Sequence, residues 1–433
     1  MSDQPISAIA DVNPSVRIPK GLIGTEAVSF IPMADVSELG QWINQQTRPL
    51  RSVSLGFTSF EEGDVLIAKI TPCLENGKGA HAVGLSNGIG FGSTEFHVLR
   101  ARPGINSRFL HHLCQWRKLR VAAESQMVGS AGQQRVQRQF FDEFRVASID
   151  ATEQSMIAQV LDTLDTAIHQ TEAIIAKLKA VKQGLLHDLL TRGIDANGEL
   201  RPPQAEAPHR YKPSPLGWIP QEWDVVTLES VSKTVTSGSR DWARFYADSG
   251  ALFVRIGNLT REHINFRYES TMYVRPPRNA DGQRTRLESG DILISITADL
   301  GIVGVVPDGL GEAYINQHIA LVRPDLDAVN SRFVGHYLAG PIAQTYISKL
   351  NDAGAKAGLN LPTIRGLVTA KPLRTEQDLI ATRLDEIDNR IQNATTESAK
   401  LRELKAGLMD DLLTGRVRVT PLLAEAEQQP RSA

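Results

Sequence analysis

A long segment of this sequence occurs twice, and that duplication limits the folds open to the chain more than any other feature. Residues Thr152–Thr191 align without a gap to Thr375–Thr414 at a constant offset of 223, with 19 of 40 positions identical. Weaker similarity continues upstream, where EEGDVLIAKIT (61–71) matches LESGDILISIT (287–297). The offset drifts there, as loop insertions and deletions produce. We therefore predict a tandem of two globular units, each followed by one copy of the duplicated segment.

Both copies of the segment have the apolar spacing of a long helix. Seam positions recur at alternating steps of four and three residues, which is a heptad pattern. In the first copy they are Ile157, Leu161, Leu164, Ile168, Thr171, Ile175, Leu178, Lys182, Leu185 and Leu189. In the second they are Ile380, Leu384, Ile387, Ile391, Ala394, Ser398, Leu401, Lys405, Leu408 and Leu412. The simplest partner for each seam is the other copy, which predicts an intramolecular antiparallel coiled coil. The alternative is that each helix packs only on its own globular unit.

Two further features of these helices call for an explanation. Gly184 and Gly407 occupy the same place in both copies, although Gly costs a helix about 1 kcal/mol relative to Ala; we predict close helix approach there. A second stripe runs beside the first seam, and its counterparts in the second copy are mostly charged. The stripe consists of Val160, Ala167, Ile174 and Val181. It is either a wider buried face or a docking surface for the helices of a partner.

Length and composition indicate a globular protein with more than one domain. A chain of 433 residues exceeds a single core. The apolar share of 41% and charged share of 22% are ordinary for such a protein. No segment predicts a membrane span or a signal peptide, and two cysteines suit a reducing compartment, so we expect a cytoplasmic location. The formal net charge of −2 means that any surface for binding a polyanion must be local or shared with a partner.

Familiar catalytic patterns are missing from the sequence. It has no Walker A loop, HExxH, metal-spaced Cys/His set, GxSxG elbow or NPPY-type methyltransferase motif. The segment GIGFG (88–92) lacks full GxGxxG spacing and predicts a hairpin turn instead of a cofactor loop. We therefore expect no catalytic, cofactor-binding or metal-binding residues in this chain.

Signals for nucleic-acid binding are stronger. Residues 238–286 contain nine Arg and no Lys, interleaved with aromatic residues. Arg suits bidentate recognition of guanine edges and phosphates, although a solvated charged face with core aromatics is the alternative. Gln, Asn and Arg also gather in the first unit, and AGAKAGLN (353–360) replaces its Gln/Arg run in the second. Candidate DNA contacts are Lys69, Thr71, Asn76, Lys78, Gln133, Gln134, Arg135 and Arg138, then Ser239, Arg240, Trp242, Arg244, Asn258, Asn316, Gln317, His318 and Lys356.

These motifs resemble those of the specificity subunits of type I restriction-modification systems. FEEGDVLIAKITPCLENGKG with GFGSTEFHVLR resembles one class of target recognition domain, and PLGWIPQEWDVVTL, TSGSRDWARFY, RIGNLT, GDILISIT and GEAYINQHIALVRP resemble another. The paired TEQ…LLTG segments resemble the two conserved spacer regions of that family. The match covers Val28 to Val419, but PLGWIP has no clear equivalent before the first domain, which leaves that domain's start open.

The resemblance implies an α+β fold. In it, an α/β target recognition domain followed by a long helix occurs twice, and the two helices form an antiparallel coiled coil. We expect target recognition domains at 1–150 and 216–373, spacer helices at 151–195 and 374–418, a linker at 196–215 and a polar tail at 419–433.

The implied function is that of a non-catalytic, DNA-reading subunit. Each domain would read one half of a bipartite site in double-stranded DNA, and the helix pair would set the unread gap. Two modification (methyltransferase) subunits and the restriction subunits would be its partners, and these would carry S-adenosylmethionine, ATP and Mg²⁺. A DNA methyltransferase with its own recognition domains and a coiled-coil scaffold without a DNA role are the alternatives.

Overall fold

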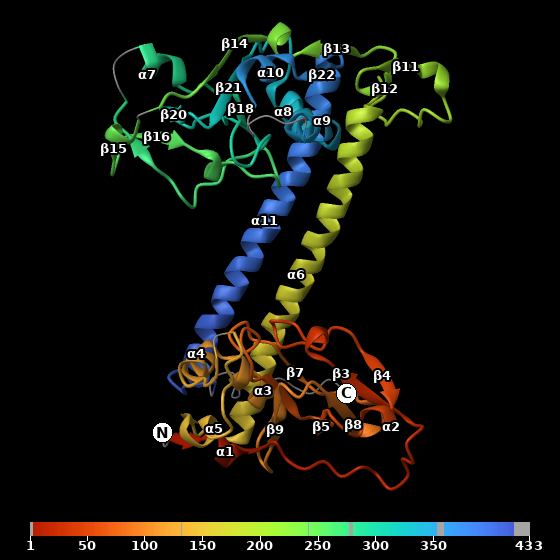
Figure 1. The fold of residues 1–433 in the computed structure, drawn as a ribbon, viewed down its shortest axis with the longest axis vertical. Coiled ribbons are helices and arrows are strands. Elements are labelled where there is room, and N and C mark those ends of the chain that lie inside the picture. Colours follow the sequence, from red (N-terminus) through yellow and green to blue (C-terminus); the bar gives the residue numbers. More distant parts are fainter. Residues whose placement is uncertain (1–2, 131, 241, 277–279, 353–358, 420–433) are drawn as a thin grey trace, which may run out of the picture. The chain divides into compact units, whose positions relative to one another are not determined.

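The computed structural model describes residues 3–130, 132–240, 242–276, 280–352 and 359–419. The chain packs as two compact units, one formed by residues 1–172 and 396–433 and the other by residues 173–395. Helix α6 (Ala151–Thr191) begins in the first unit and ends in the second, and helix α11 (Arg374–Leu412) runs from the second into the first (Figure 1). Each unit therefore contains half of both helices.

The first unit has two four-stranded sheets. One has the order β2-β9-β6-β7 and is antiparallel. Its strands are Ala10–Val12, Phe96–Ala101, Val65–Ala68 and Gly79–His81. The other has the order β4-β3-β8-β5, with β3 and β8 parallel. Its strands are Gln46–Pro49, Ala27–Ile31, Ile89–Gly92 and Thr58–Glu61. The helices are α1 (Ile6–Ile9), α2 (Leu50–Val53), α3 (Ser107–Gln115), α4 (Arg117–Ser125) and α5 (Phe140–Glu143).

The GIGFG segment is not a hairpin turn, so that prediction is wrong. Residues Ile89–Gly92 form strand β8, and Phe60 of the neighbouring strand β5 lies across Gly90. A Cβ atom built on Gly90 would lie 2.1 Å from Cε2 of Phe60. The glycines of this segment thus allow an aromatic ring to approach the backbone of a buried strand.

The second unit repeats this arrangement. Its antiparallel sheet has the order β14-β21-β18-β19. The strands are Ser232–Ser237, Ile319–Pro324, Ile292–Ser295 and Val303–Val305. Its other sheet has the order β15-β17-β16-β20, with β16 and β20 parallel. The strands are Tyr246–Ala247, Tyr273–Val274, Ala251–Val254 and Ala313–Ile315. The helices are α7 (Ala280–Thr285), α8 (Ser331–Ala339), α9 (Pro341–Asp352) and α10 (Leu361–Gly366).

Short ladders directly precede the long helices in both units. Strand β10 (Arg145–Ala147) pairs with β1 (Asp3–Pro5) just before α6. Strand β22 (Val368–Lys371) pairs in the same way with β13 (Asp224–Thr227) before α11. Strand β1 is therefore the counterpart of β13, although its sequence lacks the PLGWIP signature. Strands β11 (Tyr211–Ser214) and β12 (Gly217–Pro220) form a separate hairpin, which overlaps the segment that we expected to be a linker.

The predicted seams of α6 and α11 lie inside the two units. None of the twenty seam residues is exposed. In the second unit Lys182 of α6 forms an ion pair of 2.5 Å with Asp388 of α11. In the first unit Lys405 of α11 forms the equivalent pair with Asp165 of α6, at the same offset of 223 in both partners. Residue numbers rise along α6 as they fall along α11 in both units, so the predicted antiparallel fold class is confirmed.

The explanation offered for the two helix glycines is wrong. A Cβ atom on Gly184 or Gly407 would meet no atom within 4 Å, because both positions are exposed. Close helix approach therefore does not account for them, and nothing among the described residues does.

None of the described helices is both long enough and apolar enough to cross a membrane.

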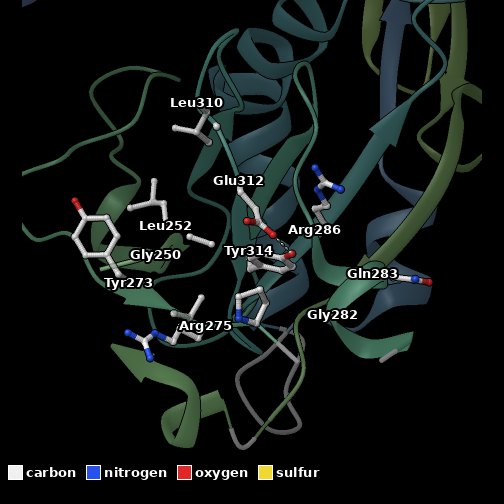
Figure 2. Close-up of a pocket in the computed structure, with 14 residues that line it drawn as sticks. Gly250, Leu252, Tyr273, Arg275, Gly282, Gln283, Arg286, Leu310, Glu312 and Tyr314 are labelled. Carbon is white, nitrogen blue, oxygen red and sulfur yellow. Dashed lines mark hydrogen bonds between the residues drawn. The ribbon is translucent and has the colours of Figure 1, made fainter. Parts of the chain in front are cut away.

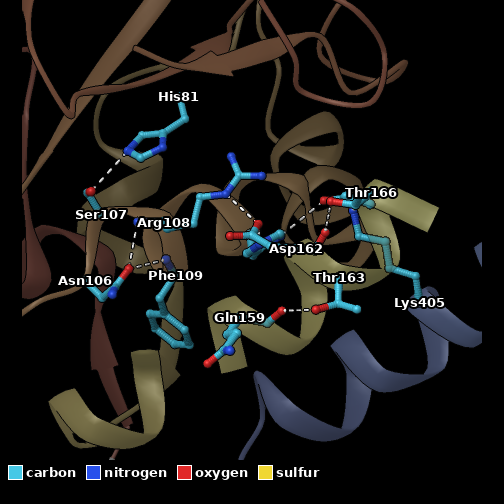
Figure 3. Close-up of polar contacts among 12 residues, drawn as sticks. His81, Asn106, Ser107, Arg108, Phe109, Gln159, Asp162, Thr163, Thr166 and Lys405 are labelled. Atoms are coloured by element: carbon cyan, nitrogen blue, oxygen red, sulfur yellow. Dashed lines mark hydrogen bonds and ion pairs between the residues drawn. The ribbon is translucent and has the colours of Figure 1, made fainter. Parts of the chain in front are cut away.

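Each unit is held to its long helices by the same polar contacts, which we call the clamp. In the first unit Asp162 of α6 accepts hydrogen bonds from Nε of Arg108 (2.6 Å) and Nε2 of His112 (2.8 Å) (Figure 3). In the second unit Asp385 of α11 accepts from Nη2 of Arg332 (2.6 Å) and Nε2 of His336 (2.7 Å). The duplication thus extends from the sequence to the contacts that orient each domain on its helix.

Candidate nucleic-acid interface

In the first unit, two of the predicted DNA-contacting segments meet beyond the end of strand β6. The backbone N–H of Thr71 donates to the carbonyl of Gln134 (3.0 Å), and that of Val136 donates to the carbonyl of Lys69 (2.9 Å). The N–H of Lys69 donates in turn to the carbonyl of Glu95, directly before strand β9. We call this group, Lys69, Thr71, Glu95, Gln134 and Arg135, the loop edge of the first unit.

Glu95 and Arg135 form a bidentate ion pair at this loop edge. Nε and Nη2 of Arg135 donate to the two carboxylate oxygens of Glu95 at 2.9 and 2.8 Å, and Nη1 donates to the carbonyl of Gln133 at 2.9 Å. The hydrogen bonds from Arg135 hold the pKa of Glu95 below its ordinary value, although burial raises it, and the charges of Arg135 and Lys69 lower it further. Both partners are thus ionised in a paired, half-exposed site.

Sequence reasoning missed Glu95. The only signal was an acid in GSTEFHVLR, one residue before a predicted strand, and nothing in the sequence placed it opposite Arg135. The pairing arises because the antiparallel strands β6 and β9 bring Lys69 and Glu95 together, and the chain after α4 then returns beside Lys69.

The remaining candidates of the first unit differ in their exposure and in the hydrogen bonds that they make within the protein. Thr71 donates through Oγ1 to the carboxylate of Glu75 (2.7 Å), and Nζ of Lys78 donates to the carbonyl of Met33 (3.3 Å). Three others lie at exposed positions, namely Asn76, Gln133 and Arg138. Those exposed side chains can reach a ligand without giving up a buried contact.

The second unit places its candidates at the matching edge. His318 directly precedes β21, as Glu95 precedes β9, and its Nδ1 lies 2.7 Å from Oγ1 of Thr297. Its Nε2 lies 3.0 Å from Nε2 of Gln317. Ser239 forms a parallel bridge with Asn316, and a Cβ atom on the neighbouring Gly238 would lie 2.0 Å from the carbonyl oxygen of Asn316. The loop edge of the second unit consists of Gly238, Ser239, Thr297, Asn316, Gln317 and His318.

One arginine of the Arg-rich segment contacts this second loop edge, and two others lie close to Ser239 in the sequence. Arg240 and Arg244 lie at exposed positions, and the Arg244 guanidinium lies 4.9 Å from the ring centroid of Phe245. Arg284, which sequence reasoning did not select, donates to Oγ1 of Thr236 (2.6 Å) and Oγ of Ser239 (2.5 Å). By contrast, Arg323 pairs with Asp291 and Glu288, each at 2.8 Å, as part of the strand framework.

Two predicted contact residues have structural roles instead. Trp242 is only 3% exposed and stacks on Phe253 with ring centroids 5.2 Å apart. Asn258 is 2% exposed, and its amide accepts from the N–H of Arg255 and donates to the carbonyl of Arg267. Neither side chain offers a surface to DNA, because burial and internal hydrogen bonds already use it. Lys356 lies outside the described residues.

A cavity of about 840 Å³ lies beside strands β16, β17 and β20 of the second unit (Figure 2). Arg275 and Arg286 line it together with Glu312 and Tyr314. The Tyr314 hydroxyl donates to the Glu312 carboxylate (2.7 Å), and burial, together with this hydrogen bond and the charge of Glu312, raises the pKa of Tyr314 to about 12. This cavity therefore offers charged and hydrogen-bonding groups within the Arg-rich segment.

The clamp of the first unit is also where described metal-type ligands cluster. Ligand atoms of His112, Asp162 and Asp165 lie within 4.8 Å of one another. Arg108 pairs with Asp162 (Figure 3), and Lys405 pairs with Asp165, so cationic side chains already neutralise both carboxylates. This arrangement fits an ion-paired clamp better than a metal centre.

The predicted second stripe of α6 changes character along the helix. Val160 is half-buried and packs against the core of the first unit, as the wider buried face requires. Ala167 is also half-buried. Ile174 and Val181, however, are 54% and 45% exposed. Among the described residues, neither side chain belongs to a hydrophobic core, so both are accessible to a partner.

Comparison with known proteins identifies the class. The family model of the type I restriction modification DNA specificity domain matches residues 220–404. Among curated proteins, the chain is 40% identical over 139 residues to the type I restriction enzyme EcoAI specificity subunit of Escherichia coli, covering 32% of this chain and 23% of that protein. It is 32% identical over 200 residues to the EcoEI specificity subunit of the same organism, covering 44% and 32%. The matched parts thus span only a quarter to a third of these relatives.

Longer but weaker matches cover most of the chain. The MjaVIII specificity subunit of Methanocaldococcus jannaschii is 23% identical over 314 residues, covering 70% of this chain and 69% of that protein. The solved structure of the type I restriction-modification S subunit from M. genitalium has a TM-score of 0.58 at 15% identity, covering 95% of this chain and 96% of that one. Residues 220–404 are therefore a type I specificity domain, and the whole chain has the fold of an S subunit. The resemblance of this sequence to the specificity subunits of type I restriction-modification systems is thereby confirmed.

Proposed function

We propose that this chain reads a bipartite DNA sequence for a type I restriction-modification complex, with each unit reading one half of the site. One observation carries the proposal: the two units present the same loop edge on the same framework, but with different side chains. A Glu–Arg pair stands in the first, and Gln317 and His318 stand in the second. Arg and Gln side chains such as those of Arg135 and Gln317 read base edges in the major groove.

The proposal assigns the chemistry to other subunits. The chain acts as a non-catalytic subunit in the cytoplasm, and two modification subunits supply adenine methylation with S-adenosylmethionine. Restriction subunits that use ATP and Mg²⁺ join the larger assembly. Net charge supports a shared DNA surface, because −2 over the whole chain leaves little long-range attraction for DNA.

The test is to express the chain with its modification subunit and sequence the methylated host genome. We expect methylated adenines in a motif of two specified parts separated by an unspecified gap. A methylated motif without two parts would contradict the proposal. Calorimetry of the purified chain with S-adenosylmethionine tests the alternative of a self-contained methyltransferase, which predicts that the chain alone binds this cofactor. A coiled-coil scaffold predicts equal, weak affinity for all DNA duplexes.

We further propose that the exposed part of the α6 stripe docks the helices of a modification subunit. Ile174→Glu places a charge on an apolar surface that a partner would bury, so assembly should weaken by roughly 2 kcal/mol or more. Ala176→Glu is the matched control, because it adds the same charge at an exposed position of the same helix off the stripe. Analytical ultracentrifugation of the complex measures the difference. An equal loss of assembly in both variants would show that the stripe is not part of the interface.

A further inference from the structure

We propose that Arg135, oriented by Glu95, reads a guanine in the half-site of the first unit. The inference rests on the proposed function and adds a base identity and a positioning residue to it. Glu95 does not itself contact DNA in this proposal. It fixes the plane and direction of the guanidinium that does.

The hydrogen bonds that Arg135 makes with the described protein atoms leave as many N–H donors as the guanine edge has acceptors. A guanidinium has five N–H groups. In the part of the chain that the structure describes, three of them donate to protein acceptors, two to Glu95 and one to the carbonyl of Gln133. Two N–H groups remain, and the guanine edge in the major groove presents two acceptors, O6 and N7. The arginine side chain is 37% exposed, so those donors can be reached from outside.

The charge balance favours a base edge over a phosphate. Glu95 neutralises Arg135, so a phosphate approaching this pair would also meet a carboxylate at close range. A guanine edge carries no net charge and therefore suffers no such repulsion. Lys69, whose charge also acts on Glu95, leaves the group of three with a single positive charge next to the base contact. That remaining charge suits a flanking phosphate.

The backbone of Arg135 is fixed as firmly as its side chain. Its N–H donates to the carbonyl of Val128, and its carbonyl accepts from the N–H of Val128. Arg135 also forms a bridge with Ile70, and the next residue, Val136, is only 2% exposed. A side chain held on both sides loses little conformational freedom on binding, which is what specific readout requires.

The experiment compares variants of the full chain, each assembled with its modification subunit, by sequencing methylated DNA. For Arg135→Ala we expect one guanine position in one half-site to become degenerate, with discrimination there reduced roughly 5- to 150-fold. Glu95→Gln should relax the same position by a smaller factor, because Arg135 is then less firmly held. The other half-site should stay unchanged in both variants, which shows that the chain still folds and assembles.

Arg102→Ala is the matched control. Arg102 pairs with Asp11 at 2.9 Å in an exposed ion pair beyond the opposite end of strand β9, and its loss should leave the motif intact. An unaltered motif in Arg135→Ala overturns the inference, as does uniform weakening at all positions, which marks a phosphate contact. A wild-type chain that directs no bipartite methylation overturns the proposed function instead, and the inference with it.

Discussion

The two units have the same framework but differ at their loop edges. Arg100 pairs with the buried carboxylate of Asp64 at 2.8 Å in the first unit, and Arg323 pairs with Asp291 at 2.8 Å in the second. The clamps also repeat, whereas the residue directly before β9 and β21 changes from Glu95 to His318. The contacts that stabilise the fold are thus the same in both units, whereas the side chains differ at the loop edges, where the strands begin or end. A protein built this way can change what it reads without changing how it folds.

The largest expected effect comes from exchanging the globular part of one unit, without its long helices. Replacing the region from Tyr211 to Pro372 with that of a relative should change one half of the methylated motif completely and leave the other half as it was. The reason is that the exchanged loop edge lies on its own framework. Methylome sequencing reads both halves at once. If both halves changed, the two loop edges would not act independently.

A second difference between the units is their response to acid. Among the described residues, burial lowers the pKa of His81, His97, His111 and His112 in the first unit, and that of His263 in the second. For His81, burial and then the charge of Arg108 lower the pKa to about 4. A histidine that stays neutral when folded but has a pKa of about 6.5 when unfolded costs stability as the pH falls below about 6.5.

We therefore expect the first unit to lose more stability than the second between pH 7 and pH 5. Pulse proteolysis in urea at the two pH values, with cleavage sites assigned by mass spectrometry, measures each unit separately. His81→Gln should remove part of the pH dependence, about 1.4 kcal/mol for each pH unit between the unfolded pKa of about 6.5 and pH 5. Equal losses in the two units would show that burial of these histidines does not govern acid stability.

The smallest effect distinguishes Arg240, which follows Ser239 of the second loop edge, from an arginine of the framework. Arg240→Ala should cost about 1–3 kcal/mol of DNA affinity if Arg240 reads a base, or lower the salt dependence by about one phosphate if it does not. Arg323→Ala should instead lower stability, because it leaves Asp291 buried without its partner. Binding isotherms at several salt concentrations, with a urea titration of each variant, distinguish the two. Unchanged binding by Arg240→Ala would remove that residue from the interface.

The parts of the structure that follow from periodicity could be predicted from the sequence. The seams of α6 and α11 extend over many heptads, so single ambiguous residues do not disturb the pattern. The direction of one side chain has no such redundancy. Trp242 and Asn258 have the residue types of a DNA contact but fill the core, and Glu95 was missed because its partner lies 40 residues away. The seam lysines were placed, but their reciprocal aspartates were recognised only in the structure.

The division of the chain also determines the order in which it can fold during synthesis. The second unit is continuous, from residue 173 to 395, whereas the first needs residues from both ends. The core of the first unit includes Ile157 and Leu161 from α6 and Leu412 and Val419 from the far end of the chain. At roughly 5–20 residues per second, about 10 to 45 seconds of translation separate the two parts. The unit that leaves the ribosome first is therefore the one that closes last, and its apolar helix surface needs protection until then.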